Sequence, residues 1–438
     1  MFSKTPAFNL KAVLNKTGLA ADTLRAWERR YGLPIPQRTS GGHRLYSEYD
    51  IETIKWLMAR QAEGLSISRA VDLWKKQTAS GADPLAGAAS QASLTLTEAP
   101  VSASLEALRA DWIAACLAFN ESAAEQTLNQ AFAMYPVETV CMDVLQKGLA
   151  QIGELWYENR ATVQQEHFAS ALAMRRLDAL LAASPAPSRK QTVIAGCPAE
   201  EWHAFTPLLL ALLLRRRGLK VLYLGANVPT EQFAETAASI RADLVILVAQ
   251  TLVTAASLQQ AAFRLANQGV QSAFGGRIFN LHPPLIESIP AHFLGHSVEA
   301  ALEETESLLR VRKEAAQPRP ISQEYAAALQ FFKSRRAEIE ITLRGLVQPL
   351  FISPESLMLG VTHLGNNIEA ALQLGDMNYV SGEIEWLKTL IKAHERPMQE
   401  LADFIASYAK AVEQNINGSG RPIYEWLSAE ADRLQKGK

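Results

Sequence analysis

TVIAGCPAEEWHAFT, residues 192–206, is an apolar run that ends in a loop of charged and aromatic residues. Its first half has the length and apolar content of a strand that is buried on both faces. Its second half places His203 two residues after a carboxylate, Glu201. Doubly wound sheets bind their ligands where the strands end. The stretch therefore predicts a parallel sheet and makes His203 a candidate metal ligand, with an ordinary polar loop residue as the alternative.

Four more short apolar runs follow, and helical stretches separate them. A chain that alternates strands with helices in this way usually forms a parallel sheet with helices on both faces. We therefore predict a doubly wound, flavodoxin-like domain over residues 189–310. Its candidate strands are TVIAGC, KVLYLG, DLVILVA, SAFGG and HFLG.

The segments on either side of this domain are helical by their apolar spacing. Residues 104–188 repeat apolar side chains at intervals of three and four, which predicts a four-helix bundle. The charged, proline-containing stretch 311–322 predicts a linker. Residues 323–438 predict a helical C-terminal domain for dimerisation or for a second ligand or partner, with breaks at Pro349, at Pro354 and around NGSGRP.

The composition is that of a multidomain α and α/β protein. The chain has 438 residues, a formal net charge of −2 and 20% charged residues. Its three cysteines lie far apart, which favours a reducing cytoplasm over a disulfide framework or a structural zinc site. No apolar run approaches the roughly 18 residues of a membrane span, so we expect no membrane partner. No catalytic triad, P-loop or catalytic carboxylate pair is recognisable, so we predict no enzymatic activity.

The N-terminal segment, residues 1–78, is basic. It holds 13 Lys and Arg against 7 Asp and Glu, which suggests contact with nucleic acid at one end of the chain. VLNKTGLAADTLRAWERR has the pattern of a helix, a turn and a second helix, and TSGGHRLY is a glycine turn flanked by cations. Residues 79–103 are rich in Ala, Ser, Gly and Thr, which predicts a flexible linker.

TLRAWERRYGLPIPQRTSGGHRLYSEYDI closely resembles the winged helix-turn-helix of the MerR family of regulators. The resemblance implies a dimer that binds a pseudo-palindromic operator in double-stranded DNA. Most of the implied contacts are to phosphates, so they set affinity more than sequence choice. By position the implied DNA contacts are Arg25, Arg29, Arg38, His43, Arg44 and Tyr46.

Residues 104–310 resemble the cobalamin-binding module of corrinoid methyltransferases and of the CarH/LitR light-responsive repressors. The resemblance rests on E-x-H at 201–203, LGANVP, QTLVT, FGGR and a W-x9-E-H pattern that begins at Trp156. It implies adenosylcobalamin as cofactor, with His203 bound to the cobalt below and Trp156 covering the upper face. The implied cofactor-binding residues are Trp156, Glu166, His167, Glu201, Thr206, Gln250, Thr254, Gly275 and Gly276.

The same resemblance implies a cytoplasmic regulator, a repressor in the first instance. Light would break the cobalt–carbon bond and change the homo-oligomer, a dimer or a tetramer, and with it the affinity for DNA. Three residues depart from the family pattern: Thr206 replaces a glycine, Gln250 a serine and Tyr157 a histidine.

These departures keep a second interpretation open. The cobalamin site would be degenerate, and another ligand, such as a bilin or other tetrapyrrole, or a partner protein would act through the C-terminal helices. His363 and His394 are candidate contacts for such a second chromophore, whose identity the sequence leaves unknown. A corrinoid carrier for methyl transfer is a third interpretation, and the DNA-binding segment argues against it.

Overall fold

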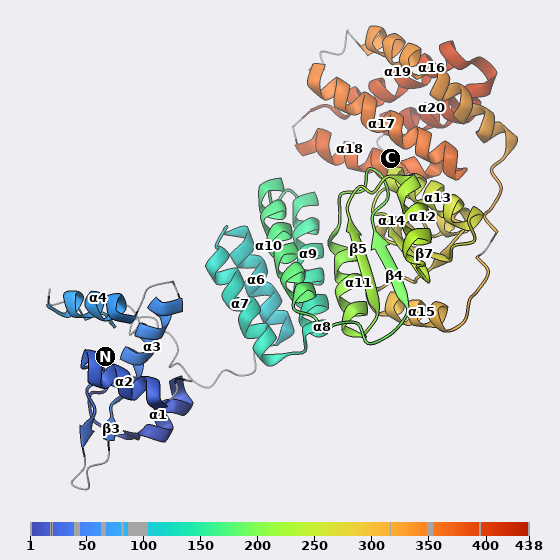
Figure 1. Ribbon diagram of the computed structural model, residues 1–438. Helices are drawn as coiled ribbons and strands as arrows, with labels where there is room; N and C mark the ends of the chain where they lie inside the picture. The colour runs from blue at the N-terminus through green and yellow to red at the C-terminus, as the bar shows by residue number, and fades with distance from the viewer. Residues whose placement is uncertain are drawn as a thin grey trace. The chain divides into compact units, whose positions relative to one another are not determined.

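The computed structural model describes residues 2–436 except 18, 20, 39–43, 63–66, 80–82, 86–103, 316, 348–353 and 394–395. The chain forms two compact units, residues 1–102 and 103–438. Most of the predicted linker 79–103 lies outside the described residues. Figure 1 shows the first unit in blue and the second in colours from teal to red.

The first unit is a small helical domain with a short antiparallel sheet in the order β1-β3-β2. The predicted helix-turn-helix is present as α1 and α2, and its core contains Leu24, Trp27, Ile54 and Leu57. The elements are β1 (Phe8–Asn9), α1 (Leu10–Thr17), α2 (Ala21–Tyr31), β2 (Gln37–Arg38), β3 (Arg44–Tyr46), α3 (Glu48–Ala62) and α4 (Ile67–Ala79).

The second unit begins with a helical bundle. Three of its elements, α8, the π-helix η1 and α9, follow one another without a break, so they form one continuous rod beside α6, α7 and α10. The predicted four-helix arrangement over this segment agrees with the described elements. They are α6 (Leu105–Leu117), α7 (Glu121–Met134), α8 (Val137–Val140), η1 (Cys141–Gln146), α9 (Lys147–Tyr157) and α10 (Val163–Ala182).

A parallel five-stranded sheet follows, in the order β5-β4-β6-β7-β8, and all five predicted strands are present. Alternate residues of β6 enter two separate cores, because successive side chains of a strand point to opposite faces. Helices therefore cover both faces (Figure 1). The strands are β4 (Thr192–Gly196), β5 (Lys220–Gly225), β6 (Leu244–Val248), β7 (Ser272–Gly275) and β8 (His292–Phe293).

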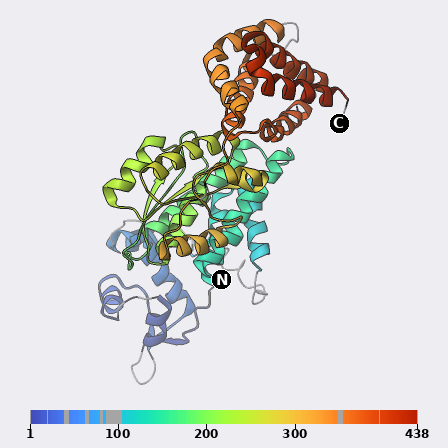
Figure 2. The same ribbon diagram turned by 90° about the vertical axis from the view of Figure 1, so that its right-hand side faces the viewer.

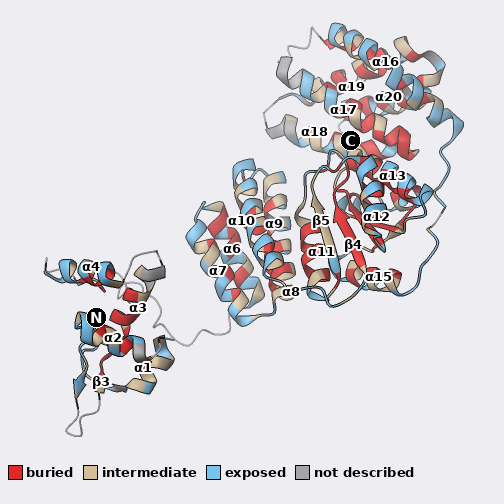
Figure 3. Ribbon diagram, in the orientation of Figure 1, coloured by how far each residue is buried: buried red, intermediate tan, exposed pale blue. Residues whose placement is uncertain are grey.

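The helix α11 (Phe205–Arg216) lies between the sheet and the bundle. All its residues from Pro207 to Leu214 are buried, because β4 covers one side and α10 the other. This explains why its sequence is apolar all round. Figure 3 shows the buried residues continuing from α11 into the strands. The remaining helices of this domain are α12 (Thr230–Ile240), α13 (Leu252–Asn267), α14 (Arg277–Leu281), η2 (Pro283–Ser288) and α15 (Val298–Arg310).

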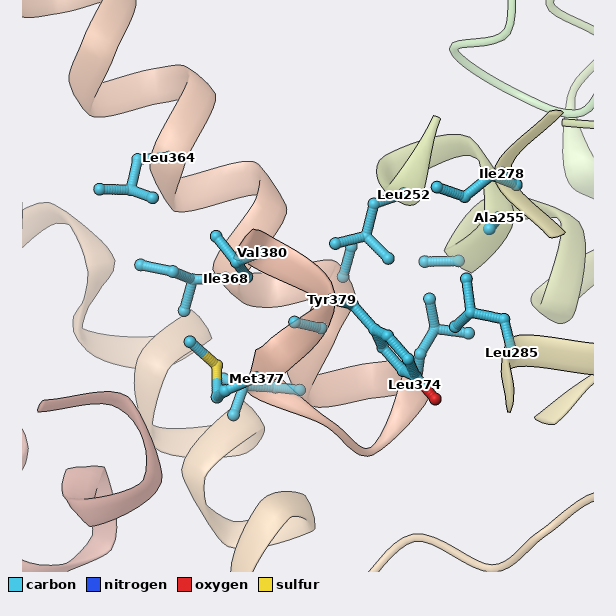
Figure 4. Packing of buried hydrophobic residues seen from close by; sticks show 14 of the residues in the cluster. Leu252, Ala255, Ile278, Leu285, Leu364, Ile368, Leu374, Met377, Tyr379 and Val380 are labelled. Carbon is cyan, nitrogen blue, oxygen red and sulfur yellow. The ribbon is translucent and has the colours of Figure 1, made fainter. Parts of the chain in front are cut away.

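The C-terminal helices pack against the sheet domain through α13 (Figures 2 and 4). Leu252 and Leu285 share a hydrophobic core with Leu374, Met377 and Tyr379 (Figure 4). Among the described residues, no helix combines the length and the apolar character that a membrane crossing needs. The elements are α16 (Gln323–Val347), α17 (Pro354–Leu374), η4 (Met377–Val380), α18 (Ser381–Ala393), α19 (Met398–Ile416), η5 (Asn417–Gly420) and α20 (Arg421–Gln435).

Candidate functional site

A buried carboxylate organises the loop that follows β4. The Glu201 side chain is 1% exposed. Its Oε1 accepts the His203 backbone N–H at 2.9 Å and faces His203 Nδ1 at 2.6 Å. Its Oε2 accepts the Gln250 N–H at 2.6 Å and the Thr254 hydroxyl at 2.7 Å. Burial by itself raises the pKa of Glu201, but these hydrogen bonds outweigh it, so the pKa lies below its usual value and the carboxylate stays charged.

His203 presents its other ring nitrogen outward. The side chain is 68% exposed, although its Nδ1 is bound to Glu201. The hydrogen bond to Glu201 raises the pKa of His203 against the effect of burial; the nearby Glu166 also raises it and Arg277 lowers it. A neutral imidazole that donates Nδ1–H to a carboxylate keeps the Nε2 lone pair free for a metal.

Gln250 and Thr254, two of the predicted cofactor-binding residues, both bind Glu201. Thr254 is 3% exposed, and its hydroxyl is committed to Glu201. The backbone of Gln250 also binds Glu201, and its side-chain Oε1 accepts the Arg277 N–H at 2.9 Å. Both residues therefore hold the loop of His203, a role that their spacing in the sequence did not reveal.

The paired glycines lie at the carboxyl end of β7. Gly276 has φ +126°, and a Cβ there would meet the Ala249 carbonyl oxygen at 1.9 Å. Only glycine fits this close approach of two backbone segments. Gly275 has open space around its Cβ position. Gly275 is buried at the end of β7, and Gly276 packs its backbone closely against that of Ala249.

The bundle contributes the facing side of the site. Trp156 and Tyr157 end α9, with ring centroids 5.0 Å apart, and Trp156 is half-buried. The Arg277 guanidinium of the sheet domain lies 5.7 Å from the Tyr157 ring centroid, so the bundle and the sheet meet here. His167 is exposed, and its Nδ1 lies 2.7 Å from Glu166 Oε2.

The donor set fits a corrinoid with cobalt. One imidazole nitrogen is free, and a buried carboxylate holds the ring in orientation. Thr206, which replaces the expected glycine, lies half-buried in the first turn of α11. Within the described residues, no group of three His, Cys, Asp or Glu side chains could hold a metal by itself.

In the first unit, the structure brings Arg44 and Tyr46 together on Glu28. Arg44 Nε donates to Glu28 at 2.8 Å and the Tyr46 hydroxyl at 2.6 Å. Tyr46 is fully buried and belongs to the core, which differs from its expected position at the DNA surface. Burial raises its pKa well above the usual range, so its hydroxyl remains a donor.

Arg25 and Arg29 are exposed on α2, where DNA contacts were expected. The side chain of Arg38 and all of His43 lie outside the described residues, as does His394. His363 Nε2 lies 2.8 Å from Glu383 Oε2 and its ring faces Trp386, so a carboxylate already binds it. The sequence did not reveal that Glu28 binds Arg44 and Tyr46, or that Arg277 meets Tyr157. Each of the two residues lies beside a recognised motif, and that position was the one signal that could have identified it.

Three stretches of the chain match protein-family models. Residues 8–77 match the model described as MerR HTH family regulatory protein. Residues 108–181 and 191–305 match two models, each described as a B12 binding domain. These stretches correspond to the first unit, the bundle and the sheet domain.

The chain is also similar to two regulators of Myxococcus xanthus. The HTH-type transcriptional repressor CarH is 31% identical over 296 residues, which cover 67% of this chain and 95% of that protein. The HTH-type transcriptional repressor CarA is 32% identical over 243 residues, 54% of this chain and 75% of that protein. The monomethylamine corrinoid protein of Methanosarcina barkeri is 20% identical, with a TM-score of 0.40, over 47% of this chain and 100% of that one. That score is too low to support a functional conclusion.

Proposed function

This chain belongs to the family of MerR-type transcriptional regulators that carry B12-binding domains, and we propose that adenosylcobalamin controls its binding to an operator in double-stranded DNA. In this proposal the protein is a repressor that forms a homodimer or homotetramer. Bound cofactor sets the oligomeric state, light is the signal, and the protein has no enzymatic role. The names of its relatives CarH and CarA support repression.

The observation that carries the proposal is the imidazole of His203. A buried carboxylate holds its Nδ1, while Nε2 faces outward from the end of β4. A carboxylate behind a ligating histidine fixes its tautomer and raises its basicity. His203 would hold the cobalt from below, and Trp156 would cover the upper face from the end of α9. Glu166, His167, Thr206, Gly275 and Gly276 would line the site.

When bound, adenosylcobalamin supplies a cobalt–carbon bond that light can break. The residues of the chain couple such a change to the arrangement of the bundle on the sheet. Trp156 and Tyr157 belong to α9, whereas His203 and Arg277 belong to the sheet domain, so the site spans the junction between the two. A change at the site therefore biases one arrangement of the junction over another, and oligomeric state follows.

Reconstitution in the dark with adenosylcobalamin, followed by desalting and illumination, tests the proposal. We expect wild type to retain a corrinoid absorption band that changes on illumination, with a parallel change in DNA binding and in mass by light scattering. His203→Ala should lose most of the retained corrinoid, whereas the control His292→Ala, whose Nε2 lies 3.2 Å from a backbone carbonyl oxygen, should keep it. A wild-type protein that retains no corrinoid would contradict the proposal.

A second candidate function has its own observation. The C-terminal helix α17 packs on α13, and α13 carries Thr254 of the Glu201 network in its first turn. A ligand or partner bound by residues 323–438 would thus act on the same loop. Corrinoid-free protein whose operator binding is still regulated would favour this candidate.

We propose the domain limits 104–188, 189–310, 311–322 and 323–438 for the second unit.

A further inference from the structure

Basic side chains gather at the edge of the sheet where the strands begin, opposite the edge of His203. Arg215 and Arg216 end α11, Arg217 follows directly after it, and Lys220 begins β5. The backbone N–H of Arg189 donates to the Gly218 carbonyl at 2.9 Å, which brings the segment before β4 to the same turn. We call this surface the basic edge; it consists of Arg189, Lys190, Arg215, Arg216, Arg217, Lys220 and Arg310.

Two carboxylates pair with part of this surface. Arg216 Nε binds Glu138 at 2.6 Å and Arg189 binds Glu306 at 2.7 Å. Those hydrogen bonds hold the pKa of each carboxyl below its usual value against the effect of burial, and the charge of Arg217 adds to both shifts. Arg217 therefore lies within reach of both pairs. Asp243, which accepts the N–H of Thr192 at the start of β4, adds a third carboxylate, so seven cations face three carboxylates and the surface keeps a net positive charge.

Five cations of the basic edge are exposed, and three of them have no recorded partner among the described residues. They are the ones left after Arg216, which is also exposed but pairs with Glu138, and Arg310, which is also exposed but donates to the Glu306 carbonyl: Lys190, Arg217 and Lys220. Within the part of the chain that the structure describes, their side chains have no recorded hydrogen bond or ion pair. Cations at the C-terminus of a helix are favoured by the helix dipole, and this effect would explain the arginines in the last turn of α11. It does not explain Lys190 and Lys220, which belong to other elements, so the surface fits an anionic partner better.

The chain enters the second unit at the same end. Gln165 at the start of α10 donates to the carbonyl of Leu117, the last residue of α6, at 2.6 Å. The charge of the neighbouring Glu166 raises the pKa of His203, so Glu166 lies near that histidine. The last residue of α6 therefore lies at the same end of the unit as the candidate cofactor site. Its first residue, Leu105, therefore lies at the opposite end, where α10 leads into β4 and the basic edge begins (Figure 1).

We propose that the basic edge binds the phosphates of the DNA duplex that the N-terminal module holds. Residues 80–103 join the module to this end and can span at most about 80 Å, so DNA bound to the module has a high local concentration here. Guanidinium and ammonium groups are the usual phosphate contacts, and such contacts are independent of base sequence. The inference rests on the DNA binding of the proposed function.

The test measures binding of the full-length chain to a mixed-sequence duplex of about 60 base pairs by fluorescence anisotropy across salt concentrations. The test variant is Lys190→Gln/Arg217→Gln/Lys220→Gln. The control is Lys410→Gln/Arg421→Gln/Lys436→Gln, which removes the same charge from exposed positions of the C-terminal helices. Each lost phosphate contact lowers the slope of log K against log salt by about 0.9, so we expect the test variant to lose about 2–3 and the control to keep the wild-type slope.

Three results would overturn the inference. Equal slopes for wild type and the test variant would show that the edge makes no phosphate contacts. An equal decrease of the salt slope in the test and control variants would show that the effect comes from net charge alone. Failure of the wild type to bind any duplex would contradict the proposed function together with the inference. A wild type that binds, with weaker binding by Arg25→Gln/Arg29→Gln and an unchanged slope in the test variant, would overturn the inference alone.

Discussion

The hydroxyl of Thr254 donates a 2.7 Å hydrogen bond to the carboxylate of Glu201, 53 residues earlier in the chain. Thr254 lies in the first turn of α13, which follows β6, and Glu201 lies in the loop after β4, so this bond joins two neighbouring strand ends of the sheet. Both groups are buried, and the same carboxylate orients His203. The bond thus makes α13 part of the support of the candidate cobalt ligand.

Replacement of Glu201 by glutamine should damage both this support and the site. The new amide NH2 group is a donor and would replace a carboxylate oxygen that accepts hydrogen bonds. At least one of the donors around it, such as the Gln250 N–H or the Thr254 hydroxyl, would then lack an acceptor. We expect a loss of about 1–3 kcal/mol in unfolding free energy and a 10–100-fold loss of corrinoid affinity. Denaturant unfolding and cobalamin titration measure the two. The neighbouring exposed Glu200→Gln is the control, and equal effects of the two substitutions would contradict the assignment.

The glycine pair offers a matched comparison. Gly276→Ala forces a side chain into a left-handed conformation and against the Ala249 carbonyl, whereas Gly275→Ala meets nothing within 4 Å. Backbone strain of this kind costs about 1–3 kcal/mol before the clash is counted. We expect a lower melting temperature for Gly276→Ala and little change for Gly275→Ala. Similar melting temperatures would show that the close approach is not needed.

The contact between α13 and α17 contains a buried amide network. Gln373 Nε2 donates to the Ala256 carbonyl at 2.8 Å and to Gln259 at 3.0 Å. Gln373→Leu would leave the buried Gln259 side-chain oxygen without this donor and remove the additional hydrogen bond to the Ala256 carbonyl, at a cost of about 1–3 kcal/mol. We expect faster hydrogen exchange in α13 and α17 with the bundle unchanged. The exposed Gln399→Leu is the control, and unchanged exchange in α13 would argue against coupling through this contact.

The ion pair between Arg189 and Glu306 predicts a pH dependence. The hydrogen bond from Arg189 lowers the pKa of Glu306, so the pair stabilises the fold above the ordinary carboxyl pKa of about 4.5, and this contribution is lost as pH falls through the lowered value. Arg189→Gln should cost at most about 1 kcal/mol at pH 7, because the pair is partly exposed.

That difference from wild type should shrink below pH 4. Urea unfolding at both pH values provides the check. The more exposed pair of Arg335 and Glu338 supplies the control, Arg335→Gln, for which we expect a smaller change. A difference that stays constant between pH 7 and pH 3.5 would show that the charge of Glu306 is not involved.

Much of the architecture was readable in the sequence because it depends on local periodicity. The five strands, the helix-turn-helix and the helical bundle follow from apolar spacing and glycine positions, which neighbouring residues determine. The candidate ligand His203 was likewise visible from one loop. Such features need no knowledge of which distant segments meet.

Contacts between distant residues were decided by the tertiary structure alone. The hydrogen bond of Thr254 to Glu201 could not be read from the sequence, and Tyr46 was expected at the DNA surface and instead lies in the core on Glu28. The basic edge likewise combines side chains from three separate segments. Burial and hydrogen bonding depend on which elements pack together in three dimensions, and the spacing of residues along one strand or helix carries no record of that.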